Sequence, residues 1–195
     1  MLRLGFVTTN PNKLREAQLV VSRYGIELYP VTVRKIEIQS DSLEEIAVYA
    51  AKKAFEEVRQ PLIVEDAGLF IDALNGFPGP YSSYVYRTIG VRGVLKLMEG
   101  VENRRARFVA VVALALSLDR IEVFRGVVEG TISYEPRGSG GFGFDPIFVP
   151  EGFDKTFAEM STEEKCAVSH RARAFEAMAR WLRENVQTLK PSTST

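Results

Sequence analysis

Two long apolar segments dominate the middle of the sequence and constrain its fold more than any other feature. Residues 107–118 and 121–134 are rich in valine and are separated only by Asp119-Arg120. Segments of this length with so short a connection favour two neighbouring antiparallel strands. The sequence therefore predicts a sheet that contains one long hairpin.

Shorter strand and helix signals alternate on both sides of the hairpin. Apolar residues recur at helical spacing over residues 11–24, and Asn10 followed by Pro11 marks the start of that helix. A capping-box pattern at residues 42–45 marks the start of a second helix, which runs to about residue 59. A similar pattern at residues 161–164 marks the start of the last helix. The remaining predicted elements are strands at 3–8, 26–33, 61–64, 69–74 and 146–149 and a short helix at 91–99. Strands interleaved with helices indicate an α/β fold with a mixed sheet.

Composition and charge exclude several classes of protein. The chain has 195 residues, 46% of them apolar, so we expect one soluble domain at residues 1–186 and a flexible tail at 187–195. Its 25 basic and 25 acidic residues leave no basic excess for binding a nucleic acid. The only cysteine and histidine are Cys166 and His170, which excludes an internal disulfide and a His/Cys zinc site. No apolar run is long enough for a membrane span or a signal peptide, and a reducing cytoplasm is the expected compartment.

The first candidate site is the turn between the first strand and the first helix, Thr8-Thr9-Asn10-Pro11-Asn12-Lys13. The free N–H groups and partial positive charge of a helix N-terminus suit a phosphate group. Lys13 opposes the helix dipole in the first turn but suits an anionic ligand. The alternative is a capped helix with a solvated lysine, and the glycine pattern of a Walker loop is absent.

An acidic pair is the second candidate. Glu65 and Asp66 follow the apolar strand at 61–64, so we expect them at its carboxyl end, where open α/β sheets bind ligands. Alternation along a strand points the two side chains in opposite directions, so one of them serves a given site. A carboxylate that faces a phosphate repels it unless a hard cation lies between them, and Mg²⁺ fits that requirement. Glu37 is the candidate for a second carboxylate, and an ordinary acidic loop is the alternative.

The glycine-rich loop at 138–143 is the third candidate. It matches G-x-G-x-x-G, but Pro146 leads back into a strand, so the match is no dinucleotide fingerprint. The loop instead suits a close approach of backbone to a ligand. Phe142 or Phe144 is available to stack on a base, with core packing as the alternative.

The fourth candidate is the last predicted helix. Lys165 and Ser169 are four residues apart, so they lie on one face of that helix, and His170 and Arg171 follow. A histidine next to an arginine is more often a surface feature than a binding group. Cys166 lacks a neighbouring base and is interpreted as a small packed residue.

In their order along the chain, six short motifs resemble the inosine triphosphate pyrophosphatase family, whose members hydrolyse non-standard purine nucleoside triphosphates. The resemblance covers residue 3 to about residue 185, and the second and third motifs are most similar to those of archaeal members. The motifs are Thr8-x-Asn10-x-x-Lys13, Glu37-Ile-Gln39, Val64-Glu-Asp66-Ala-Gly68, Leu74-Asn-Gly-Phe-Pro-Gly79-x-Tyr81-Ser82, Gly141-Phe-Gly-Phe-Asp-Pro146 and Ser169-His-Arg171.

The resemblance implies a two-lobed α/β fold with a long mixed, twisted sheet flanked by helices, an active-site cleft between the lobes, and a homodimer. It implies cleavage of ITP, dITP and XTP between the α and β phosphates with Mg²⁺. The products are the monophosphate and pyrophosphate, and the reaction cleanses the nucleotide pool.

The resemblance also implies roles for individual residues. Asp66 would orient or deprotonate the attacking water and would hold the metal together with Glu37. Phe144 would stack on the purine, and Lys53 is the alternative to Lys52 as a phosphate-binding lysine. The residues implied to bind the substrate are Thr8, Thr9, Asn10, Lys13, Lys52, Ala67, Phe142, Gly143, Phe144, Asp145, Lys165, His170 and Arg171. Whether Glu65 contacts the metal is left open.

Two other functions remain alternatives. One is the same type of enzyme acting on modified pyrimidine nucleotides, as in the related septum-inhibitor-like pyrophosphatases. The other is a nucleotide- or RNA-binding module without turnover. The neutral charge balance weighs against RNA, and a binding module has no need for acids opposite a phosphate site.

Overall fold

The computed structural model describes residues 2–185, so the predicted tail at 187–195 lies outside the described residues. Within this range seven strands form one sheet, in the order β2-β1-β3-β5-β6-β7 with β4 paired to β3. β1 runs parallel to β2 and β3, and the other pairs are antiparallel, so the sheet is mixed as predicted. The strands are β1 (Leu2–Phe6), β2 (Ile26–Pro30), β3 (Leu62–Ile71), β4 (Pro78–Gly79), β5 (Arg105–Ser117), β6 (Arg120–Ile132) and β7 (Phe148–Pro150).

The predicted hairpin is confirmed as β5 and β6, which pair from Arg105↔Thr131 to Ser117↔Arg120. On its other edge β5 pairs with the whole of β3. Residues 108–115 of β5 are all buried, since helices or loops cover both faces of the sheet there. A strand buried on both faces has a continuous apolar sequence instead of an alternating one, which explains the valine-rich segment.

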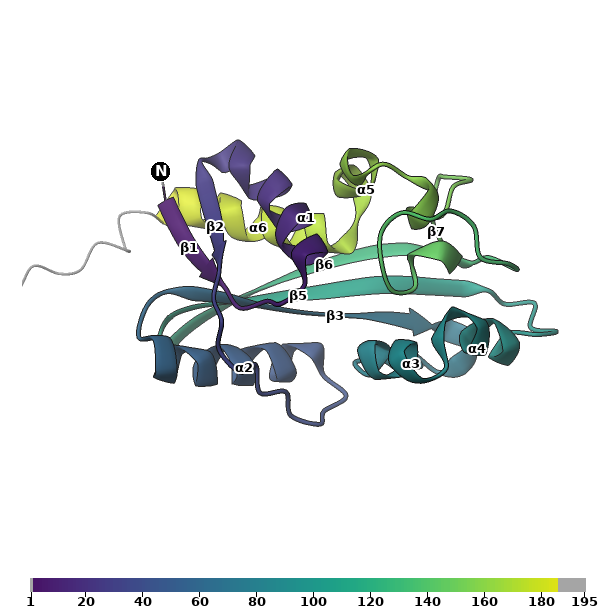
Figure 1. Ribbon diagram of the computed structural model, residues 1–195, viewed down its shortest axis with the longest axis horizontal. Coiled ribbons are helices and arrows are strands. Elements are labelled where there is room, and N and C mark those ends of the chain that lie inside the picture. Colours follow the sequence, from purple (N-terminus) through teal and green to yellow (C-terminus); the bar gives the residue numbers. More distant parts are fainter. Residues whose placement is uncertain (1, 186–195) are drawn as a thin grey trace, which may run out of the picture.

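Helices cover both faces of the sheet (Figure 1). α1 (Pro11–Val21) and α6 (His170–Asn185) pack on one face, and α2 (Leu43–Val58) packs on the other. α3 (Ser82–Thr88) and α4 (Gly90–Leu97) lie towards the opposite end of the long strands from α2. One lobe contains α1, α2 and α6 with the two apolar clusters that they bury against the sheet. The other lobe contains α3 and α4 with a third cluster. None of the helices in residues 2–185 is long and apolar enough to cross a membrane.

One strand prediction is wrong, and the error concerns the acidic pair. The segments at 61–64 and 69–71 belong to a single strand, β3, so Glu65 and Asp66 lie in its middle and not at its carboxyl end. Both residues pair with β5, opposite Val112 and Val111. The charges do not end the strand because each carboxylate has a basic partner. The predicted alternation of the two side chains is retained.

The last helix is interrupted, contrary to the prediction. α5 (Thr162–Val168) ends before Ser169, which adopts an extended conformation with ψ of 157°, and α6 begins at His170. The hydroxyl of Ser169 accepts a hydrogen bond from the backbone N–H of Ala172 at 3.2 Å and thereby caps α6. Lys165 and Arg171 therefore belong to two helices, joined at a corner.

The glycine-rich loop behaves as the sequence indicates. It leads into a 3-10 turn at Asp145–Ile147 and then into β7, so its G-x-G-x-x-G pattern opens no α-helix. β7 begins two residues later than predicted because that turn takes up the first part of the segment.

Close packing of α6 on β6 depends on Gly126. A Cβ atom at this position would clash with the carbonyl oxygen of His170 and would lie 2.6 Å from the backbone nitrogen of Ala174. We expect Gly126→Ala to push α6 from the sheet and to lower the free energy of unfolding by about 1–3 kcal/mol. Chemical denaturation measures this change, and an unchanged midpoint would contradict the role of Gly126.

Candidate functional site

The turn after β1 has the geometry of a helix N-terminal site. The side-chain oxygen of Asn10 accepts hydrogen bonds from the backbone N–H groups of Asn12 at 2.9 Å and Lys13 at 3.4 Å. The hydroxyl of Thr8 accepts a hydrogen bond from the N–H of Asn10 at 3.1 Å, while Thr9 is exposed. The predicted cap is confirmed, and it fixes Lys13 in the first turn of α1.

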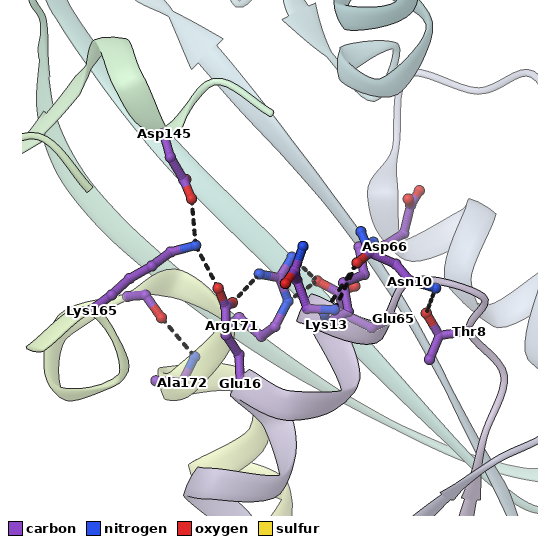
Figure 2. Close-up of polar contacts among 12 residues, drawn as sticks. Thr8, Asn10, Lys13, Glu16, Glu65, Asp66, Asp145, Lys165, Arg171 and Ala172 are labelled. Carbon is purple, nitrogen blue, oxygen red and sulfur yellow. Dashed lines mark hydrogen bonds and ion pairs between the residues drawn. The ribbon is translucent and has the colours of Figure 1, made fainter. Parts of the chain in front are cut away.

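Buried charged side chains form a row beside this turn (Figure 2). Nζ of Lys165 lies 2.7 Å from Oδ2 of Asp145 and 2.6 Å from Oε1 of Glu16. The other carboxylate oxygen of Glu16 lies 2.6 Å from Nη1 of Arg171. Asp145 also accepts a hydrogen bond from the backbone N–H of Phe142 at 3.0 Å. The four charged residues are buried, so each depends on its neighbours for compensation of its charge.

Glu65 continues the row towards the helix terminus. Its Oε1 lies 3.0 Å from Nη2 of Arg171, and its Oε2 lies 2.8 Å from Nζ of Lys13. Burial raises the pKa of a carboxyl group, but Arg171 and Lys13 hold the pKa of Glu65 well below its usual range. Burial likewise disfavours a charged guanidinium, yet Glu65 and Glu16 raise the pKa of Arg171 above its ordinary value. Both partners are therefore charged at neutral pH.

Asp66 points to the opposite face of the sheet from Glu65. There it meets Glu37 through Lys35, whose Nζ lies 2.6 Å from Oε1 of Glu37 and 3.7 Å from Oδ1 of Asp66. Lys35 also donates a hydrogen bond to the backbone carbonyl of Glu65 at 3.2 Å. Burial raises the pKa of Asp66 to about 6, against the opposing effect of Lys35.

Glu37 and Asp66 both reach the ammonium of Lys35, so a metal cation bound between them would have to displace that ammonium. Among residues 2–185, no group of three or more His, Cys, Asp and Glu side chains could hold a metal ion. Two carboxylates at one position suit a cation that takes few protein ligands and completes its shell with water and phosphate oxygens. Mg²⁺ binds in this way, so the residues present fit the metal that the sequence predicts.

A cavity of about 310 Å³ opens next to the row of charges. Its size lies at the lower end of the range for small-molecule sites and suits a ring system. Gly68 lies in its wall beside Ala67, and so do Ser82, Ser83, Tyr86 and Phe108, for which the sequence predicted no binding role. The predicted binding residues that line it are Asn10, Lys13, Ala67, Phe142, Gly143, Phe144, Asp145, His170 and Arg171.

The two phenylalanines of the glycine-rich loop differ in accessibility. Phe144, to which the family resemblance assigns base stacking, is 3% exposed and packs edge-on against Tyr86 with ring centroids 5.5 Å apart. Phe142 is half-buried, and its ring centroid lies 4.8 Å from Nζ of Lys165 and 5.2 Å from Cζ of Arg171. Phe142 is therefore the better placed ring for stacking on a flat ligand.

His170 forms part of the cavity wall and is not a surface residue. Its ring stacks on Phe108 with centroids 4.6 Å apart and an interplanar angle of 11°. Burial, reinforced by the charges of Arg171 and Lys165, lowers the pKa of His170 well below its usual value, so the ring is neutral. Within the described chain its Nδ1 atom has no hydrogen-bond partner.

Four predicted binding residues do not line this cavity: Thr8, Thr9, Lys52 and Lys165. Thr8 and Thr9 precede α1 and Lys165 belongs to the row of charges, but Lys52 lies apart from both. Lys52 is exposed on α2 and does not line the cavity. Its alternative, Lys53, forms an ion pair with Glu56 at 2.8 Å and does not line the cavity either. The structure therefore brings neither lysine to the row of charges.

Besides Ser83, Tyr86 and Phe108 of the cavity wall, three residues of the site were not predicted from the sequence. Glu16 lies on the buried face of α1. Its spacing of four residues from Val20, which puts both side chains on one face of a helix, was the signal available in the sequence. Lys35 is two residues before Glu37, the spacing that places side chains on one side of an extended segment. Ser82 begins α3, a helix of seven residues that is too short to show a helical apolar spacing in the sequence.

The site is polarised along its length. Lys165 and Arg171 place hydrogen-bond donors at one end, Lys13 and the N-terminus of α1 add positive charge beside them, and Glu37 and Asp66 can hold a cation. This order suits an elongated ligand that has a polar ring at one end and anionic groups at the other.

Known proteins have sequences and structures similar to those of this chain. The family model described as the Ham1 family matches residues 4–181. The chain is 57% identical over 178 residues to a dITP/XTP pyrophosphatase of Ignicoccus hospitalis, covering 91% of this chain and 95% of that protein. It is 53% identical over 186 residues to a dITP/XTP pyrophosphatase of Thermococcus kodakarensis, covering 95% and 100%. The structure of a HAM1 protein from Coxiella burnetii is similar with a TM-score of 0.85 at 34% identity, covering 94% of this chain and 100% of that one.

Proposed function

The chain belongs to the Ham1 family, and from this membership and the polarised site we propose that it hydrolyses non-canonical purine nucleoside triphosphates. The substrates are dITP, XTP and ITP, and the products are the nucleoside monophosphate and pyrophosphate. The observation that carries the proposal is the row of buried charges, which joins donors suited to a 6-oxo purine with a site suited to phosphates.

Selection against adenine follows from the base end of the site. Lys165 and Arg171 carry only donor groups, so they favour a carbonyl oxygen over an amino group. Both are held by buried carboxylates, which leaves them little freedom to turn towards another partner. A ligand that fails to accept from buried donors loses about 1–3 kcal/mol for each donor left without a partner. Phe142 supplies a face on which the purine stacks.

The phosphate end uses the first turn of α1. The N–H groups at the start of the helix and the ammonium of Lys13 bind the triphosphate. Glu37 and Asp66 hold Mg²⁺, which neutralises phosphate charge and polarises the phosphoryl group when bound. Asp66 orients the attacking water and accepts its proton, a role that requires the charged form of its carboxylate.

A panel of triphosphates tests the proposal. ITP, dITP, XTP, ATP, GTP and modified pyrimidine triphosphates are incubated with the enzyme and Mg²⁺, and pyrophosphate and orthophosphate are measured separately. We expect pyrophosphate release from the first three substrates and far slower release from ATP and GTP. Orthophosphate as the first product, a preference for pyrimidines, or tight binding of ITP without hydrolysis would each contradict the proposal.

Metal binding should depend on pH in an unusual range. An ordinary aspartate stays charged down to about pH 4, but the raised pKa of Asp66 makes it neutral below about pH 6. We expect the affinity for Mn²⁺ or Mg²⁺ without nucleotide to fall about tenfold for each pH unit below that value. Calorimetric titrations between pH 7.5 and 5 measure it, and a constant affinity over that range would contradict the prediction. In Asp66→Asn this pH dependence should be absent.

A further inference from the structure

The carboxylate of Glu65 is shared between the two ends of the site. Its side chain is 0% exposed, and its two oxygens take different cations. Oε1 lies 3.0 Å from Nη2 and 3.1 Å from Nε of Arg171, on the base side. Oε2 lies 2.8 Å from Nζ of Lys13, on the phosphate side. A carboxylate that holds both cations at once is able to couple binding at the base end to binding at the phosphate end.

No other carboxylate in residues 2–185 is paired with both of these cations. Glu16 contacts Arg171 and Lys165 but not Lys13. Asp66 forms its ion pair with Lys35. This difference between two buried glutamates provides a matched pair for experiment.

The two contacts of Glu65 have different consequences for a ligand. Arg171 is almost fully buried, so its pairing with Glu65 fixes the direction of its donors. The side chain of Lys13 is 22% exposed and lines the cavity, so a phosphate oxygen can reach its ammonium. Because Glu65 neutralises that ammonium, an incoming phosphate has to compete with Glu65 for it.

We propose that Glu65 is a positioning residue that links base recognition to phosphate binding, an inference that rests on the proposed function. Glu65 fixes the direction of the Arg171 donors that face the base. It also holds the ammonium of Lys13 until a polyphosphate takes the place of Glu65 as the partner of that ammonium. It thereby strengthens discrimination between bases and weakens the binding of pyrophosphate. Tight product binding would slow each turnover, so the restraint on Lys13 favours release of pyrophosphate.

Glu65→Gln separates these two effects because they change in opposite directions. Loss of the negative charge frees Lys13, and we expect pyrophosphate to bind roughly three- to tenfold more tightly, as measured by calorimetry with Mg²⁺ present. Loss of one anchor of Arg171 should lower the ratio of kcat/KM for ITP to that for ATP by a similar factor. A general loss of structure would weaken both properties, and weaker or unchanged pyrophosphate binding would overturn the proposal.

Glu16→Gln is the matched control. It removes the charge of the other buried carboxylate partner of Arg171 but leaves the Lys13–Glu65 pair in place. We expect it to lower the ITP-to-ATP ratio without tightening pyrophosphate binding. If Glu16→Gln tightens pyrophosphate binding as much as Glu65→Gln does, the effect is a general one of charge and the proposal is wrong.

Lys13→Met provides a second variant, at a residue whose own side chain is partly exposed. It releases one oxygen of Glu65, so we expect the ITP-to-ATP ratio to change although Lys13 lies at the phosphate end. Equal losses of kcat/KM for ITP and ATP would show that the two ends are not coupled. Binding of pyrophosphate and of IMP is measured without turnover, so failure of the coupling is distinguishable from failure of the proposed activity.

Discussion

Asp66→Asn is expected to lower the rate of pyrophosphate release from ITP by about a thousandfold. The substitution preserves the shape of the side chain, but an amide neither accepts a proton from water nor offers the charge that a metal ion requires. Asp66 lies in the middle of β3, where strand pairing with β5 holds the backbone in place. The fold should therefore persist. Rates are measured by pyrophosphate detection at saturating Mg²⁺.

Asp72→Asn is the control for this variant. Asp72 follows β3, is well exposed, and pairs with Arg107 at 3.3 Å, away from the cavity. Exposed ion pairs contribute about 0–1 kcal/mol, so this variant should keep its activity and nearly all of its stability. An Asp66→Asn enzyme that retains more than about a tenth of the activity would exclude Asp66 from the reaction.

Lys165→Met is expected to cause the largest loss of stability. Its side chain is 3% exposed, and its ammonium compensates both Glu16 and Asp145, whose carboxylates are buried as well. Removing one member of a buried ion pair leaves uncompensated charge and costs about 3–5 kcal/mol. Equilibrium unfolding in urea measures the loss, and an unchanged slope with denaturant concentration would show that compactness is retained.

Lys155→Met is the matched control. Lys155 forms an ion pair with Glu164 at 3.2 Å, but both side chains are more than half exposed. Water already solvates these charges, so we expect a change of less than about 1 kcal/mol. If the two lysine variants have similar stabilities, the row of buried charges does not stabilise the fold.

Local signals in the sequence were enough for much of the fold. The hairpin of β5 and β6 was predictable because long apolar segments with a two-residue connection have few other arrangements. The starts of α1, α2 and α5 were predictable because Asn10, Ser42 and Ser161 cap them through hydrogen bonds to backbone groups two or three residues away. Interactions of this range depend little on the rest of the chain.

The errors arose where distant residues decide the local structure. Glu65 and Asp66 would end a strand if they were solvated, yet β3 continues through them because Lys13, Arg171 and Lys35 reach them from elsewhere in the chain. The corner at Ser169 also escaped prediction, since the segment has helical composition and the hydroxyl of Ser169 starts α6 afresh. Neither feature has a signal within the segment itself.

The sequence by itself determined the mixed α/β class, the capped start of α1 at Asn10 and, through its ordered motifs, the family of nucleotide pyrophosphatases. Only the tertiary structure decided which charges meet. Glu16 is separated by 149 residues from Lys165, and Glu65 by 106 from Arg171, so no local pattern records these pairs. Burial then gives them their strength, because charges removed from water must be compensated by the neighbours that the fold supplies.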